Sequence, residues 1–180
     1  MKKIFVTIIL SSTLLLSCTK QFIELTPQSQ VTDASFFKTA TDVTNAVTAS
    51  YAALQDQTMY QDRFITMMET RGDNVEDQNP GGNVGRDFNI DRFLAKADNT
   101  GINDAYASLY NAIARCNNVL EHSSLVTDAT LKSQYEGEVR FLRALHYFNI
   151  VRLWGAAPLV LKTITAADAK KLSRNTVTEL

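Results

Sequence analysis

The sequence predicts an all-α, mainly helical fold, in which antiparallel helix hairpins are joined by long loops. Three segments carry apolar residues at the three- and four-residue spacing of an amphipathic helix. A short polar connection separates the last two, which favours antiparallel packing of their apolar stripes. The composition is that of a globular chain, since 45% of the 180 residues are hydrophobic and 21% are charged. We therefore expect one folded domain behind an N-terminal segment of a different kind.

The N-terminus has the pattern of an export signal followed by a lipid-attachment cysteine. Lys2 and Lys3 precede an apolar run over residues 4–16. About 13 residues of helix rise only about 20 Å, too little to cross a hydrocarbon core of about 30 Å. The run ends in Leu-Leu-Ser-Cys, which resembles the lipobox of bacterial lipoproteins. We predict a lipoprotein signal peptide over residues 1–17 and diacylation of Cys18, with an ordinary signal peptide and an incidental cysteine as the alternative.

An acylated Cys18 would anchor the mature chain to a membrane that it does not cross, because two or more acyl chains give stable attachment. Residues 18–38 then form a lipid-anchored tether and extended segment, in which Pro27 disfavours regular structure. The other cysteine, Cys116, has no disulfide partner once Cys18 is acylated. We expect Cys116 to be a small buried hydrophobic residue in a helix.

The helical domain is predicted over residues 39–180, and its first helix has a defined start. Thr39 and Asp42 have the spacing of a capping box. An apolar face follows at helical spacing as far as Leu54. The next segment, residues 59–71, fits either a short helix or an extended buried segment.

Residues 72–101 are predicted to be a long loop without regular structure, because glycine, proline, asparagine and aspartate are interleaved there. Long loops in compact domains are often functional. Asn103 and Asp104 can then cap a second helix that ends near His122. Its apolar stripe consists of Tyr106, Leu109, Tyr110, Ile113, Cys116 and Leu120.

A third and longer helix is predicted to start after Thr127 or Asp128 and to stop at Gly155. Its buried face includes Leu131, Tyr135, Val139, Leu142, Leu145 and Asn149, with Phe141 and Phe148 widening it. The second and third helices together resemble a tetratricopeptide-like hairpin, which cannot cover its own outer face. Thr176 and Glu179 again have capping-box spacing, so a new helix should begin near the end of the chain. We interpret the domain as truncated at its C-terminus.

The segment over residues 137–160 carries the most specific motif of the chain. Its sequence is GEVRFLRALHYFNIVRLWGAAPLV, and it is very similar to the hallmark segment of the SusD/RagB nutrient-binding family, an E-x-R-F-L-R-A-x-x-Y-F helix followed by aromatic-Gly-x-x-Pro. The lipobox, FIELTPQSQVTDASFF, SYAALQ, RGDNVED and LYNAIARCNNVLEH resemble other segments of the family in the same order. Tyr106 departs from the tryptophan that is frequent at its position but keeps a large aromatic side chain. The resemblance implies the N-terminal portion of a SusD-like helical scaffold with tetratricopeptide-like hairpins and long loops.

The resemblance also implies a function. It predicts a surface-exposed, lipid-anchored protein of the cell outer membrane that binds glycans or other oligomeric nutrients and delivers them to a partner SusC-like TonB-dependent transporter. It implies no catalysis and no cofactor. Glycan capture needs aromatic faces and planar amide or guanidinium groups, and the loop over residues 72–101 supplies such side chains. The candidate ligand-binding residues are Asn74, Gln78, Asn79, Asn83, Arg86 and Phe88.

Two other functions remain as alternatives. Helix hairpins of this type often bind proteins, so the first is a protein-binding scaffold lipoprotein. The second is a secreted glycoside hydrolase that uses Asp73, Glu76 or Asp77, although a solvated turn accounts for these carboxylates more simply. The formal net charge of -1 provides no basic field to gather phosphates. Nucleic acid is therefore not an expected partner.

Polar residues on the third helix are interpreted as structural. Arg140, Arg143 and His146 are three residues apart, which is the spacing of an ion-pair or hydrogen-bonding face. We expect His146 to be partly buried with its hydrogen bonds satisfied. His122 is the only other histidine in the sequence, so a zinc site is not expected. Trp154 should plug the junction between the helix and the following loop.

Overall fold

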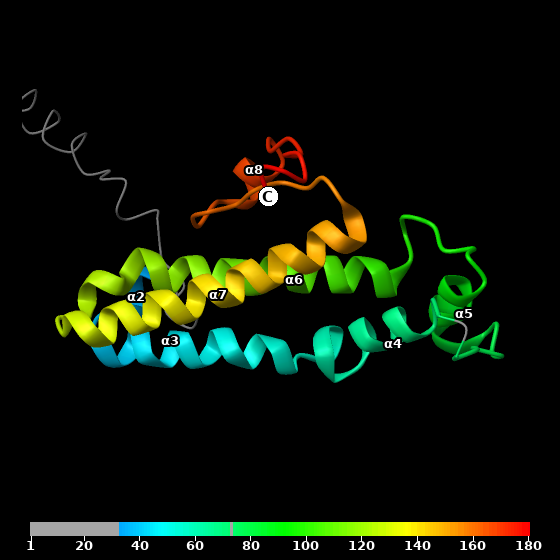
Figure 1. Cartoon of the computed structure of the whole chain (residues 1–180), viewed down its shortest axis with the longest axis horizontal. Coiled ribbons are helices and arrows are strands. Elements are labelled where there is room, and N and C mark those ends of the chain that lie inside the picture. Colours follow the sequence, from blue (N-terminus) through cyan, green and yellow to red (C-terminus); the bar gives the residue numbers. More distant parts are fainter. Residues whose placement is uncertain (1–32, 73) are drawn as a thin grey trace, which may run out of the picture. The chain divides into compact units, whose positions relative to one another are not determined.

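The computed structural model describes residues 33–72 and 74–180, apart from a few side chains in these ranges. The chain divides into two units, Met1–Phe36 and Phe37–Leu180. The described part of the first unit is a short helix, α2 (Asp33–Phe36). In the second unit the described residues form helices and turns without a β-strand (Figure 1), which confirms the all-α, mainly helical prediction.

Two long helices of the second unit form its main hairpin. Its α-helices are α3 (Ala40–Ala52), α4 (Arg63–Glu69), α5 (Arg86–Asp91), α6 (Thr100–His122), α7 (Ala129–Trp154) and α8 (Ala166–Ala169). Short 3-10 or π-helical turns lie at Ala53–Gln55, Gln57–Gln61, Gly82–Gly85 and Ser123–Leu125. α6 and α7 pack along each other, and α3 packs against both (Figure 1). This arrangement confirms the predicted hairpin and its cover by the first helix.

The start of α3 is fixed by the predicted capping box. The backbone N–H of Thr39 donates to Asp42 Oδ2 at 2.7 Å, and the N–H of Asp42 donates to Thr39 Oγ1 at 3.3 Å. These two bonds satisfy N–H groups that the first turn of a helix leaves without partners. Val43 and Val47 follow on the buried face of α3.

The segment whose structure the sequence left open is helical, with a kink. A π-helical turn at Gln57–Gln61 precedes α4, and Met59 within it has φ −111° and ψ −131°, outside the helical region. Met59, at the kink, and Phe64, after it, are both buried in the core. The kink therefore lets both side chains reach the same core.

The second long helix begins earlier than predicted. Asn99 is its N-cap, and Asn99 Oδ1 accepts from the N–H groups of Gly101 at 3.0 Å and Ile102 at 3.3 Å. The prediction of a cap at Asn103 or Asp104 is wrong, because Asp104 lies inside α6 and forms an ion pair with Arg63 of α4. The predicted end at His122 is confirmed.

The termini of α7 are confirmed, and its predicted buried face is confirmed in part, since Val139, Leu142 and Asn149 are buried and Leu131, Tyr135 and Leu145 are half-buried. Asp128 caps the helix, and Gly155, with φ 71°, ends it in a conformation that favours glycine. Phe141 and Phe148 are 69% and 61% exposed, so they do not widen the buried face as predicted. His146, Tyr147 and Ile150, which were not predicted to lie on the buried face, are buried as well.

The structure contradicts the expected environment of His146. Its side chain is completely buried, and neither ring nitrogen has a hydrogen-bond partner among the described groups. Burial lowers the pKa of His146 to about 4, because the charged imidazolium loses its hydration. His146 is therefore a neutral core residue.

The long loop contains regular structure that was not predicted. The expectation of none over residues 72–101 is wrong at Gly82–Gly85 and in α5. Arg86 is buried at the start of α5 and donates to Asp87 through Nε at 2.7 Å and Nη2 at 2.6 Å. Asn99 Nδ2 donates to the Arg86 carbonyl at 3.0 Å and ties α5 to the start of α6. The bond between Asn99 and Arg86 joins residues 13 apart in the sequence, so local turn preferences do not reveal it.

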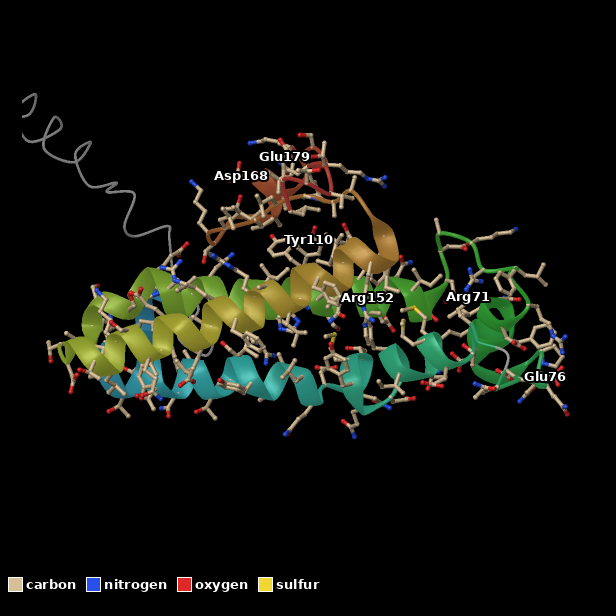
Figure 2. All side chains as sticks on the ribbon, in the orientation of Figure 1. Arg71, Glu76, Tyr110, Arg152, Asp168 and Glu179 are labelled. Carbon is tan, nitrogen blue, oxygen red and sulfur yellow. The ribbon has the colours of Figure 1, made fainter. Side chains whose placement is uncertain are left out.

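The segment that follows α7 folds back over the α6–α7 hairpin. Tyr147 Oη accepts from the N–H of Val160 at 2.6 Å, and Asn117 Nδ2 donates to the Val160 carbonyl at 3.1 Å. Tyr110 Oη donates to the Pro158 carbonyl at 2.7 Å, and Figure 2 shows Tyr110 between the hairpin and this segment. A β-bridge between Ala157 and Asn175 then holds the last residues against it.

Candidate functional site

A cleft of about 660 Å³ opens where the end of α4, the residues after α5, the start of α6 and the end of α7 meet. The side chains that give it chemical character are Arg71, Phe93, Lys96, Tyr106, Trp154 and Arg174. Met67 and Ile90 supply apolar floor from the core. A second hollow, of about 420 Å³, is lined by Leu54, Gln55, Tyr60 and Gln61 and offers no charged group. The first cleft is therefore the better candidate among the described residues.

Phe93 enters the cleft from an unusual backbone conformation. The N–H of Leu94 donates to the Asn89 carbonyl at 2.8 Å, and the N–H of Phe93 donates to the Ile90 carbonyl at 3.2 Å. This is the Schellman pattern that ends many helices, and it places Phe93 at the left-handed position where glycine is usual. Phe93 has φ 58° and is 72% exposed. Strained conformations of this kind are concentrated at functional sites.

Arg71 lies against the ring of Phe93. Its guanidinium carbon is 4.0 Å from the ring centroid, and its Nη1 donates to the Ile90 carbonyl at 3.1 Å. The cation–π contact and the hydrogen bond together orient the guanidinium at the cleft. An aromatic face and a forked donor are thus presented side by side.

Two further aromatic residues, Tyr106 and Trp154, also line the cleft. Tyr106 and Trp154 pack edge to face with ring centroids 5.2 Å apart. Trp154 is the last residue of α7, so it lies at the junction of helix and loop as predicted, and it also lines the cleft. Half-buried aromatic rings of this type are pre-positioned by core packing.

Charged residues from two distant parts of the sequence complete the rim. Lys96 follows α5, whereas Arg174 belongs to the C-terminal segment. Arg174 is brought to the cleft by its neighbour Asn175, whose N–H donates to the Ala157 carbonyl at 2.9 Å and whose Oδ1 accepts from the N–H of Leu159 at 3.0 Å.

The predicted ligand residues lie along the loop and around α5, away from the cleft lining. Asn74, Gln78 and Asn79 are exposed, and the Asn79 side chain accepts from the N–H of Gly81 at 3.2 Å. Arg86 is held in its buried pair with Asp87. Phe88 is half-buried, with the Arg92 guanidinium 5.7 Å from its ring. Cys18, Asp73 and the side chain of Asn83 lie outside what the structure describes.

The two described carboxylates of the alternative hydrolase site are engaged in local contacts. Glu76 forms an ion pair with Arg92, and Figure 2 shows it at the outer end of the loop, away from Arg71. Asp77 Oδ1 accepts from the N–H of Asn79 at 2.8 Å. The Asp77 contact belongs to a turn, whereas the Glu76 contact ties the loop to the end of α5.

The structural interpretation of the α7 arginines is supported by their partners. Arg143 Nη1 donates to Asn117 Oδ1 of α6 at 2.7 Å, and Arg140 pairs with Glu136 one turn away at 3.4 Å. Cys116 is buried and free, and burial raises the pKa of its thiol to about 11. Over residues 33–72 and 74–180 there is no group of three His, Cys, Asp or Glu side chains suited to a metal ion. None of the helices described there is long and apolar enough to span a membrane.

Comparison with known proteins assigns the chain to a family. Residues 21–180 match a SusD-like family described as starch-binding and associating with the outer membrane. The chain belongs to the SusD-like family. Two SusD-like proteins of Formosa agariphila, P38 and P25, are 30% and 25% identical to it over 96% and 88% of this chain. These matches cover 33% and 31% of the relatives, so the chain spans about a third of their length.

Solved SusD-like structures share the fold. A SusD superfamily protein from Bacteroides vulgatus superposes with a TM-score of 0.72 at 21% identity, over 80% of this chain and 32% of its own. A SusD-like protein from Bacteroides fragilis gives a TM-score of 0.67 at 25% identity, over 86% of this chain and 29% of its own. The helical scaffold of the SusD-like family is therefore the scaffold of this chain.

The cleft residues were missed in the sequence for a definable reason. Arg71 lies within the RGDNVED segment and Trp154 within the hallmark segment, but neither was selected as a ligand residue. Phe93 carries no local signal, because glycine normally marks the position that it occupies. Arg174 is distant in sequence, and only the bridge between Ala157 and Asn175 brings it to the site.

Proposed function

We propose that this SusD-like chain binds glycans in the cleft between α4, α5, α6 and α7. The observation that carries the proposal is an aromatic cleft in a chain whose family is described as starch-binding. Pyranose rings have apolar faces that stack on aromatic rings. In the cleft, the aromatic rings are those of Phe93, Tyr106 and Trp154. Sugar hydroxyls need hydrogen-bonding groups, which Arg71 and Asn103 provide in the same lining.

The binding step belongs to uptake at the cell outer membrane. Acylated Cys18 anchors the protein there, and it delivers glycan or another oligomeric nutrient to a SusC-like TonB-dependent transporter without catalysing a reaction. The lipobox supports the anchor, and the family's described association with the outer membrane supports the location. Incorporation of labelled palmitate that is lost in Cys18→Ala tests the anchor. Co-purification with a TonB-dependent transporter from the native membrane tests the partner, and absence of both would contradict this assignment.

A matched pair of phenylalanines tests the cleft. Phe93 and Phe148 are both largely exposed, and each has an arginine guanidinium over its ring, at 4.0 Å and 5.5 Å. Phe93→Ala is expected to weaken glycan binding at least about tenfold, or about 1.4 kcal/mol, in isothermal titration calorimetry against a glycan panel. Phe148→Ala, on the outer face of α7, should bind like the wild type. Equal glycan affinity of the two variants would place the glycan site elsewhere. Absence of detectable binding to every glycan of the panel would reject glycan binding.

A further inference from the structure

We infer that the cleft selects glycans that carry negative charge, as uronate carboxylates or sulfate esters, over neutral glycans. The inference rests on the proposed function and specifies the class of ligand. Among the described lining residues, every side chain charged at neutral pH is cationic: Arg71, Lys96 and Arg174. The net charge of the whole chain is -1, so this excess is local and does not reflect a basic protein.

The cations around the cleft differ in whether they are neutralised. In the region from α4 to the start of α6, Arg63 pairs with Asp104, Arg86 with Asp87 and Arg92 with Glu76. The remaining two cations of that region are Arg71 and Lys96. Neither of them, nor Arg174, forms an ion pair with a described carboxylate. Within this region, the two cations that form no ion pair with a described carboxylate are thus both in the cleft lining.

Arg71 is suited to an oxyanion rather than to a hydroxyl alone. Stacking on Phe93 and the bond from Nη1 to the Ile90 carbonyl fix its plane. One of its five N–H donors is used in that bond, which leaves donors for a two-point contact with a carboxylate or sulfate. The adjacent ring of Phe93 would stack on the sugar that carries the anionic group.

Lys96 and Arg174 act mainly through their field. Both are exposed, so their attraction for an anionic chain is reduced by dissolved salt. Three cations that face one cleft nevertheless raise the local concentration of a polyanion and speed its association. A charged glycan should therefore bind more tightly than its neutral counterpart, with a difference that shrinks as salt is added.

Pairs of polysaccharides that differ in charge measure the effect of glycan charge on affinity. Polygalacturonate is compared with carboxyl-reduced polygalacturonate, and dextran sulfate with dextran, by calorimetry at about 50 mM and about 500 mM salt. We expect the charged member of at least one pair to bind at least about tenfold more tightly at the lower salt concentration. The pair that shows the larger difference distinguishes carboxylate from sulfate.

Two double variants test whether the preference for the charged polysaccharide arises in the cleft. The double variant Lys96→Gln with Arg174→Gln is expected to bind the charged member about tenfold more weakly than the wild type. Lys162→Gln with Arg140→Gln removes the same number of positive charges from exposed positions outside the described cleft lining, and it should preserve the preference. Loss of the preference in both double variants, or in neither, would overturn the inference.

The outcomes also separate this inference from the proposed function. The charged and neutral polysaccharides of each pair could bind equally well to the wild type, with both losing affinity in Phe93→Ala. This result would overturn the charge selectivity but would still support glycan binding in the cleft. Absence of binding to all four polysaccharides and to a wider glycan panel would overturn both.

Discussion

Phe93 combines a backbone penalty with an exposed aromatic ring. A residue other than glycine in the left-handed region costs roughly 1–2 kcal/mol, and the 72% exposure of Phe93 means that little of this is recovered by burial. The contact with Arg71 recovers a part, since an exposed cation–π pair contributes about 0.5–1 kcal/mol. The position therefore sacrifices some stability for a ring held at the cleft.

Replacement of Phe93 should reverse the usual order of stability of alanine and glycine variants. Both Phe93→Gly and Phe93→Ala remove the ring, but only alanine keeps the strain at φ 58°. Phe93→Gly is expected to be more stable than Phe93→Ala by about 1 kcal/mol in urea unfolding. In a helix interior, the alanine variant would instead be the more stable one by a similar amount. If the alanine variant proves more stable, Phe93 does not occupy the left-handed position in solution.

His146 should make stability depend on pH in a window of its own. The unfolded chain takes up a proton near pH 6.5, whereas the folded chain holds His146 neutral down to about pH 4. A falling pH in this window therefore favours the unfolded state and lowers the free energy of unfolding by about 2 kcal/mol at pH 5, and the effect fades as the pH rises above 6.5. Urea unfolding at pH 7 and pH 5 measures the difference.

A His146→Leu variant provides the control. It removes the titrating group and the two unpaired ring nitrogens while keeping a side chain of similar size, so it should be at least as stable as the wild type at pH 7. Its stability should change little between pH 7 and pH 5. The carboxylates with lowered pKa, such as Asp42 and Glu136, start from ordinary values of 3.8 and 4.5 and lose their contribution only at lower pH. If His146→Leu still loses about as much stability between pH 7 and pH 5 as the wild type, His146 is not the cause of the pH dependence.

At the scale of elements, side-chain caps define where the long helices start. Asp128 Oδ1 accepts from the N–H groups of Thr130 at 2.9 Å and Leu131 at 3.0 Å. Each capped N–H would otherwise lack a partner within α7. Asn99 does the same for α6. These bonds are local, and the residue types that make them are visible in a sequence.

Asp128→Ala should destabilise the domain by about 1 kcal/mol, because alanine cannot accept either bond. Asp128→Asn should remain close to the wild type, since asparagine is an equally good N-cap. The midpoint of urea unfolding monitored by circular dichroism distinguishes the two. Equal losses in both variants would show that the charge near the helix N-terminus, rather than the cap bond, is what matters.

At the scale of the whole molecule, the outer face of α7 is an apolar surface. Phe141 and Phe148 are two turns apart and both exposed, with Leu145 half-buried between them. Exposed apolar surface of this kind promotes association of proteins in solution. The hairpin thus buries one face of α7 and leaves another to solvent, as expected for a single tetratricopeptide-like pair.

Phe141→Gln with Phe148→Gln should reduce self-association of the 180-residue chain. Light scattering over a concentration series measures the effect, and circular dichroism should show unchanged helicity because glutamine is a good helix former. Leu161→Gln, at an isolated exposed position in the segment after α7, serves as the control. If the double variant associates as the wild type does, this face does not mediate association.

Features that depend on neighbours along the chain could be predicted without the structure. Thr39, Asp128 and Gly155 mark helix boundaries through bonds or backbone angles within one turn, and the periodicity of apolar residues predicts which stripes meet in the hairpin. The hallmark segment over residues 137–160 likewise indicated the family. These signals are local, so a linear pattern contains them.

The set of residues that form the cleft depends on tertiary contacts and could not be predicted in the same way. Arg71, Phe93 and Arg174 come together because a Schellman turn, the fold-back of the segment after α7 and the pairing of Ala157 with Asn175 place them there. The burial of His146 and Arg86 was equally hidden, because it depends on which elements cover each side chain in the folded protein. Contacts between residues distant in sequence have no periodic signature, and their energies outweigh local preferences once the core forms.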